Sequence, residues 1–260
     1  RECGQKILDV CKSGGTTAII IGHVTKEGVI AGPRMLEHMV DTVLYFESDL
    51  GSRFRVIRAV KNRFGPVNEL GFFSMTGGGF KEVKSPSAIF LAGRGESVPG
   101  SITLVTREST RSLLVEVQAL VDDTQGSHPK RVAQGLDAQR LNLLLAVLHR
   151  HCGIAAGEKD VFVNVVGGLR VSETAIDLAL ILAIFSSFRE HHPPPKLVVF
   201  GEIGLTGEVR PVPFGEERLA EAQKHGFRKA VIPQGNLPRK KIPDIDVIPV
   251  SSLDQALEIF

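Results

Sequence analysis

The sequence predicts an α/β protein built of two consecutive domains, residues 1–93 and 94–260. Its length of 260 residues exceeds the roughly 150 residues of a typical single domain and is ample for a buried core. Apolar runs of strand length alternate with segments of helical periodicity, a pattern typical of sheets covered by helices. Hydrophobic residues make up 43% of the chain and charged residues 23%, which excludes a wholly disordered or collagen-like chain.

The first domain is expected to begin with a helix over residues 1–13, which the glycines at 14 and 15 end. The continuous apolar run 17–22 is typical of a parallel strand that is buried on both faces. We then expect a short helix over residues 35–40 and a strand over 42–46. A half-exposed strand that alternates arginine with apolar residues is expected over 53–60, and a glycine-rich hairpin over 66–80.

The pattern breaks over the glycine-rich stretch 93–100, where the domain boundary is placed. The second domain is predicted to be α+β, with a largely apolar and therefore buried helix over 174–188. Its other helices are expected over 136–152, 216–225 and 253–260, and its strands over 101–107, 111–121, 161–166, 197–202, 207–211, 230–233 and 247–249.

Charge and cysteine content narrow the classes of function. The formal net charge is only +2, so any case for nucleic-acid binding must rest on local clusters. The three cysteines have no paired spacing and the histidines lack partners at ligand spacing, so no disulfide framework or metal site is expected. A reduced, cytoplasmic protein without a membrane segment is predicted. Because the chain opens with Arg1 and not with Met, it is expected to be part of a longer protein.

The chain contains no phosphate-binding loop of the P-loop type. Residues 77–81 read Gly-Gly-Gly-Phe-Lys, which lacks both the required spacing and the hydroxyl residue after lysine. This chain alone therefore cannot form a complete P-loop ATPase.

A cluster of positive charge lies on the strand predicted over 53–60 and just beyond it. Five basic residues and no acidic residue occur between positions 53 and 63, namely Arg53, Arg55, Arg58, Lys61 and Arg63. The pattern fits a solvated strand face. It also fits a pair of cations, two residues apart on an extended chain, that point toward phosphate oxygens.

The residues that follow carry a resemblance to a known family. Lys61, Asn62, Arg63, Phe64 and Gly65 form the five-residue signature of the bacterial RadA (Sms) family of DNA-repair proteins. The stretches 21–28 and 32–41 resemble the end of that family's RecA-like ATPase core. The resemblance continues through residues 131–133, 135–137, 165–168 and 207–213.

This resemblance implies the parts of a nucleotide-driven motor. A RadA protein has an N-terminal four-cysteine zinc finger and a Walker A loop with ATP and Mg²⁺, all of which would precede this chain. Lys61 and Arg63 would act in trans on the nucleotide of a neighbouring subunit, in the manner of an arginine finger. His23 would sense nucleotide, while Lys26 and Arg34, in the loop over 23–34, would approach DNA.

The second domain is similar to the proteolytic domain of the Lon family, through residues 201–209. That peptidase needs a serine nucleophile and a lysine base. Ala175 occupies the place of the serine and Gly215 the place of the lysine, and Ser172 has no base beside it. The resemblance thus implies a proteolytically inactive domain that serves as an oligomerisation platform.

The resulting hypothesis is a DNA-dependent ATPase that drives branch migration of recombination intermediates. It would form a homo-oligomeric ring, expected to be a hexamer, and act on single-stranded and branched DNA with a RecA-type recombinase. Candidate backbone contacts for duplex DNA in the second domain are Lys130, Arg131, Arg140 and Arg210, although a surface ion pair is favoured for each of them taken singly. The alternatives are a non-catalytic Lon-like ring scaffold that binds DNA or partner proteins and, third, an active peptidase.

Overall fold

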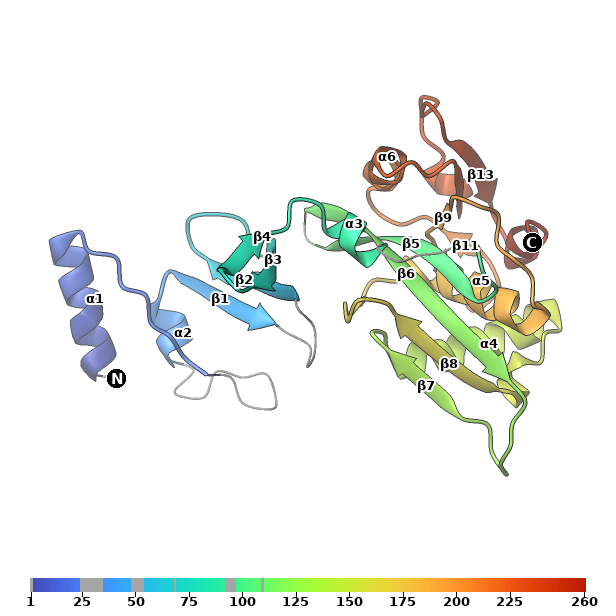
Figure 1. Ribbon diagram of the computed structural model, residues 1–260, viewed down its shortest axis with the longest axis horizontal. Helices are drawn as coiled ribbons and strands as arrows, with labels where there is room; N and C mark the ends of the chain where they lie inside the picture. Colours follow the sequence, from blue (N-terminus) through green and yellow to red (C-terminus); the bar gives the residue numbers. More distant parts are fainter. Residues whose placement is uncertain (1, 24–34, 48–53, 68, 92–96, 109) are drawn as a thin grey trace. The chain divides into compact units, whose positions relative to one another are not determined.

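The computed structural model of the chain describes residues 2–23, 35–47, 54–67, 69–91, 97–108 and 110–260 (Figure 1). These residues form two compact units that divide between Glu82 and Val83, ahead of the boundary expected after residue 93. The difference arises at helix α3 (Pro86–Phe90), which packs against a strand of the second unit. Each unit is described separately.

The first unit is an antiparallel sheet preceded by two helices. Helices α1 (Glu2–Gly14) and α2 (Met35–Met39) precede the sheet. Its strands lie in the order β1 (Thr42–Glu47), β2 (Phe54–Asn62), β3 (Leu70–Thr76) and β4 (Gly79–Glu82). Its small core contains Val43, Ala59, Leu70 and Phe72. The expected helices, strands and hairpin over 35–80 are therefore confirmed.

The prediction of a buried parallel strand over residues 17–22 is wrong. The segment has no strand structure, and the side chains of Ile19 and Ile21 are 88% and 89% exposed. A buried parallel strand requires strands on both sides of it, and the four-stranded sheet of this unit is antiparallel and built from residues 42–82. The apolar composition indicated burial, but no described element covers these side chains.

The second unit contains a mixed seven-stranded sheet with the order β13-β12-β9-β5-β6-β8-β7. Its strands are β5 (Ser101–Glu108), β6 (Arg111–Asp122), β7 (Arg131–Gln134), β8 (Asp160–Val165), β9 (Leu197–Val199), β12 (Lys229–Pro233) and β13 (Asp246–Val250). Both partners of β6 are antiparallel to it, whereas the other neighbours run parallel. The chain is thus an α/β protein with a sheet that contains parallel strands, as predicted.

Helices cover this sheet and supply much of its core. The helices are α4 (Ala138–Cys152), α5 (Ile176–Arg189), α6 (Gly215–Lys224) and α7 (Leu253–Leu257). Strand β10 (Glu202–Ile203) pairs with β11 (Val209–Arg210) in a separate two-stranded ribbon. Helix α5 is buried along nearly its whole length and packs against β5 and β6, as its apolar composition predicts. No helix within the described ranges is both long and apolar enough to cross a membrane.

Close packing at the start of β5 requires a glycine. Gly100 has a φ of +81°, and a Cβ atom there would lie 2.2 Å from the carbonyl oxygen of Ala119. The Gly100 amide donates to Ser186 Oγ of α5, while its carbonyl accepts from the Ala119 amide. The glycine therefore joins the first strand of the sheet to both its neighbour and the central helix.

Candidate functional site

The five-residue signature lies at the end of β2, directly after an irregularity in the strand. Val43 pairs with Lys61 and Leu44 with Ala59, so Val60 is an extra residue in β2 without a counterpart in β1. Because of this β-bulge, Ala59 and Lys61 occupy successive ladder positions and face opposite sides of the sheet, which regular alternation would prevent. The bulge thereby sets the direction of Lys61.

Lys61 binds the carboxyl end of α2. Its Nζ donates to the carbonyl oxygens of Glu37 at 2.8 Å and His38 at 3.0 Å. The last carbonyls of a helix have no partner within it, and in a five-residue helix this leaves most of the backbone acceptors open. Lys61 satisfies two of them and so ties α2 to the sheet.

Arg63 binds the connection between α2 and β1. Its amide donates to the carbonyl oxygen of Asp41 at 2.9 Å, and its Nη1 lies 3.2 Å from Asp41 Oδ1. Both side chains of this ion pair are substantially exposed, 63% for Arg63 and 45% for Asp41, so the pair contributes little to stability. The two signature cations thus converge on one segment, residues 37–41.

The remaining signature residues build a tight turn. Asn62 Nδ2 donates to the Pro66 carbonyl oxygen at 3.1 Å. A Cβ atom on Gly65 would lie 2.7 Å from that same nitrogen, so glycine is needed for the bond to form. Phe64, at the tip of this turn, is 81% exposed, and the Arg63 guanidinium lies 5.6 Å from the centre of its ring.

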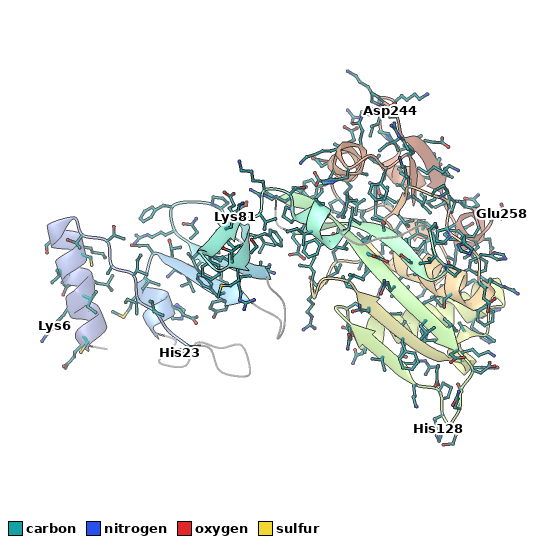
Figure 2. The ribbon with its side chains drawn as sticks, viewed as in Figure 1. Lys6, His23, Lys81, His128, Asp244 and Glu258 are labelled. Atoms are coloured by element: carbon teal, nitrogen blue, oxygen red, sulfur yellow. The ribbon has the colours of Figure 1, made fainter. Side chains whose placement is uncertain are left out.

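The other candidates of the first unit are placed only in part. His23 is exposed at the end of the first described segment (Figure 2). Lys26, Arg34 and Arg53 lie outside the described residues. The proposed nucleotide sensor and the proposed DNA loop therefore stay predictions.

The basic candidates of the second unit lie on separate elements. Lys130 and Arg131 lie at the start of edge strand β7, where the Lys130 amide donates to Asp160 Oδ1 and Arg131 Nη2 donates to the Gly157 carbonyl. Arg210 lies on the β10–β11 ribbon, and its Nη2 pairs with Glu208 Oε1 at 2.6 Å. Hydrogen bonds from Thr206, from the Glu208 backbone amide and from Arg210 lower the pKa of the Glu208 carboxyl to about 2.

Arg140 has a role within the fold. Its Nε donates to Asp177 Oδ1 at 2.9 Å, and its Nη2 donates to the Ile203 carbonyl at 3.1 Å. Asp177, in the first turn of α5, has no exposed side-chain surface. Burial raises the pKa of Asp177, and the ion pair with Arg140 opposes that rise. Arg140 therefore joins α4, α5 and β10, which sequence reasoning missed when it grouped this side chain with surface cations.

Neither position of the Lon-type dyad can carry peptidase chemistry. Ala175 is 1% exposed, immediately before α5, and has no hydroxyl group. Gly215 opens α6, where a Cβ atom would lie 2.8 Å from Asn236 Nδ2. Asn236 is itself bound to both the amide and the carbonyl of Val212 at 2.8 Å, so it is not free to make room for a lysine.

An ion pair with a buried arginine joins α6 to the segment before α5. Arg218 of α6 is 1% exposed and binds Glu173 through Nη1 at 2.9 Å and Nη2 at 2.7 Å. Glu173 Oε1 also accepts hydrogen bonds from Thr106 Oγ1 and the Arg107 amide, both at 2.7 Å. This network was not predicted. An arginine in a polar helix gives no sign in the sequence of being buried.

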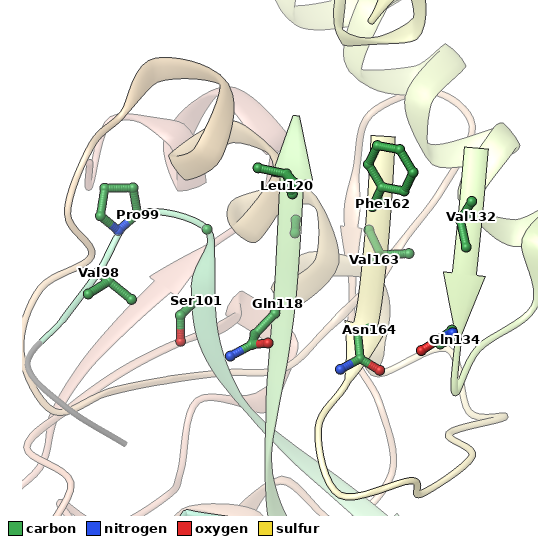
Figure 3. Close-up of a pocket in the computed structure, with 12 residues that line it drawn as sticks. Val98, Pro99, Ser101, Gln118, Leu120, Val132, Gln134, Phe162, Val163 and Asn164 are labelled. Carbon is green, nitrogen blue, oxygen red and sulfur yellow. The ribbon is translucent and has the colours of Figure 1, made fainter. Parts of the chain in front are cut away.

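A hollow of about 430 Å³ lies over β5, β6, β8 and β7 (Figure 3). The strand register aligns its lining side chains in two rows, a polar row of Ser101, Gln118, Asn164 and Gln134 and an apolar row of Leu120, Phe162 and Val132. Neither row contains a cation or a titratable pair. Within the described part of the chain, no group of three or more metal-ligating side chains was found.

Comparisons with known proteins identify the family. Residues 120–236, which lie wholly in the second unit, match the family model described as subunit ChlI of Mg-chelatase. Three curated relatives carry the name DNA repair protein RadA: 57% identity to the protein of Pseudomonas aeruginosa over 99% of this chain, 53% to that of Haemophilus influenzae over 100%, and 52% to that of Escherichia coli over 100%.

The second unit is thus similar, over residues 120–236, to subunit ChlI of Mg-chelatase. The chain as a whole belongs to the RadA family of DNA repair proteins. It spans somewhat more than half the length of these relatives, 57%, 57% and 56% in turn.

Proposed function

We propose that the protein to which this chain belongs is a DNA-dependent ATPase of recombinational repair, which drives branch migration of recombination intermediates. The observation that carries the proposal is the signature turn, where Lys61 and Arg63 are held two residues apart on one segment in a chain of the RadA family. The relatives' printed name supports a role in DNA repair.

The donors of the two cations suit a polyphosphate ligand. The ammonium group of Lys61 has three N–H donors, of which two bind α2, and the guanidinium of Arg63 has five, of which one binds Asp41. Each side chain can thus bind a phosphate oxygen without leaving its present partners. ATP with Mg²⁺ supplies the phosphoryl group. Lys61 and Arg63 would stabilise negative charge on it, in trans, at a neighbouring subunit's site.

Further parts of the proposal follow from family membership. His23 would respond to nucleotide, and Lys26, Arg34, Lys130, Arg131 and Arg210 would contact single-stranded and branched DNA. The protein would assemble as a hexameric ring in the cytoplasm, cooperate with a RecA-type recombinase, and carry zinc in an N-terminal finger. The separate placement of β7 and β11 suggests that Lys130 and Arg210 reach DNA at different points.

A non-catalytic scaffold is the competing function. It is favoured by the second unit, which is the better packed of the two and lacks both residues of the peptidase dyad. On that view the signature cations only tie α2 to its sheet. The two functions predict different results for loss of Lys61. A motor would lose ATP hydrolysis and branch migration, whereas a scaffold would lose only stability of the first unit.

The test is replacement of Lys61 or Arg63 by Ala in the full-length protein, followed by assays of ATP hydrolysis and branch migration. Either variant should lose about 10³-fold or more in the rate of ATP hydrolysis, as arginine-finger residues do, and should still bind nucleotide. Lys81→Ala is the matched control, because Lys81 is an exposed lysine on β4 of the same sheet (Figure 2).

Thermal unfolding of each variant should be measured in parallel. Full ATP hydrolysis and branch migration in Lys61→Ala would eliminate the motor role of the signature and leave the scaffold. A loss of rate that merely follows a loss of folded protein would do the same.

A further inference from the structure

Phe64 is the most exposed aromatic side chain among the described residues of the chain. It is 81% exposed, compared with 60% for Phe46, 54% for Phe80 and 49% for Phe214. Phe46 and Phe80 lie 6.3 Å apart, and the Arg107 guanidinium lies 3.7 Å from the Phe214 ring, whereas the Arg63 guanidinium lies 5.6 Å from the centre of the Phe64 ring. Val60 and Val67, at either end of the same turn, add exposed apolar surface at 42% and 47%.

The turn that presents Phe64 is held on both sides. Before the ring, Arg63 is fixed by its amide and its guanidinium to Asp41. After the ring, the Asn62–Pro66 hydrogen bond closes the turn and needs the glycine at 65. An aromatic side chain that is presented by a fixed turn loses little conformational entropy when a partner buries it. Such preorganised aromatic groups are the usual anchors of protein interfaces.

We propose that Phe64 is the anchor with which the signature turn docks on a second copy of the chain. This inference rests on the proposed function and deepens it. If Lys61 and Arg63 act on the nucleotide of a neighbouring subunit, the turn between β2 and β3 must lie in that interface, and Phe64 is its most exposed large apolar side chain. The ring would bury apolar surface beside the neighbour's nucleotide site, while the cations bind phosphate.

The division of labour in the signature follows from this. Lys61 and Arg63 supply charge, Asn62 and Gly65 hold the turn closed, and Phe64 supplies binding energy for assembly. Loss of the ring should therefore weaken association and leave the chemistry of an assembled site in place. Loss of Lys61 or Arg63 should leave association unchanged and remove ATP hydrolysis.

The experiment compares Phe64→Ala with Phe80→Ala in the full-length protein. Sedimentation across a range of protein concentrations gives the concentration at which half the protein is assembled. For Phe64→Ala we expect this concentration to rise about 10-fold or more, as loss of one buried aromatic ring allows. ATP hydrolysis should recover at high protein concentration, and Phe64→Leu should restore part of the association. Phe80→Ala, whose ring packs on Phe46 and Phe73 of its own sheet, should assemble like the unchanged protein.

A photo-reactive phenylalanine analogue at position 64 identifies the molecule that contacts this side chain. It should cross-link one full-length chain to another. Cross-links to DNA alone, or unchanged assembly of Phe64→Ala, would overturn the inference, as would an equal shift in Phe80→Ala. Lys61→Ala separates the two proposals, because it should assemble normally and lose ATP hydrolysis. If it keeps that activity, the proposed function fails, whereas the assembly measurement still decides the role of Phe64.

Discussion

Arg218 carries a full charge into the interior of the second unit. All three guanidinium nitrogens have acceptors: Glu173 for two of them, the Val105 carbonyl at 2.7 Å and the Pro213 carbonyl at 3.0 Å. A buried charge is tolerated only when it is paired and hydrogen-bonded in this way. The side chain thereby connects α6 with β5 and with the segment before α5.

We expect Arg218→Met to lower the free energy of unfolding by about 3–5 kcal/mol, because it leaves the Glu173 carboxylate without its charged partner. Arg228→Met is the matched control, since the Arg228–Asp244 pair is exposed, and should cost no more than about 1 kcal/mol. Urea unfolding of the chain measures both. Combining Arg218→Met with Glu173→Gln should recover part of the loss, and equal costs for the two arginines would contradict this account.

Helix α2 depends on contacts from outside itself. Five residues are too few for an isolated helix to persist in water, because nucleation is costly and few internal bonds form. Lys61 provides two hydrogen bonds to its carboxyl end, and Arg63 holds the residue that leads into β1. The signature is thus also the support of a neighbouring element.

Removing the ammonium group should be visible in that helix. In Lys61→Met, the backbone amides of residues 37–41 should exchange with solvent about tenfold faster or more, since hydrogen bonds to a charged donor contribute about 1.5–3 kcal/mol. Amides of β5 and α5 should be unaffected. Hydrogen exchange followed by mass spectrometry measures this, with Lys81→Met as the control. Unchanged exchange over 37–41 would mean that α2 is held by other contacts.

Local patterns in the sequence predicted most elements of both units, because helix periodicity, glycine breaks and apolar runs are short-range properties. The isoleucines at 19–21 show the limit: their composition indicates burial, but burial depends on a partner that a local pattern does not contain. The same holds for the site. The signature identified Lys61 and Arg63, whereas the bulge at Val60 and the contacts with residues 37–41 depend on strand register. Strand β7 and helix α3 were missed because each is only four or five residues long.

At the scale of the whole molecule, the second unit is a compact mixed α/β fold. Its sheet and central helix are well buried, and Ala175 and Gly215 lie at the positions that the resemblance to Lon assigns to nucleophile and base. Ser172 is exposed three residues before Ala175 and belongs to no nucleophile–base pair that the structure displays.

The chain should therefore cleave no unfolded protein, and a fluorophosphonate probe should label it no more than its Ser172→Ala variant. Restoring the dyad by Ala175→Ser together with Gly215→Lys should not create activity, because a side chain at 215 displaces Asn236 from Val212. Probe labelling that disappears in Ser172→Ala would reveal a relocated nucleophile and refute this expectation.

The two edge strands of the seven-stranded sheet affect whether a strand of another chain can pair with the sheet. Strand β13 contains Pro249, which has no N–H to offer an incoming strand, and β7 is four residues long and begins with Arg131 beside Lys130. Proline, charge and shortness at a margin all discourage a foreign strand from extending the sheet. We therefore expect that copies of this unit do not associate by adding strands at either edge of the sheet.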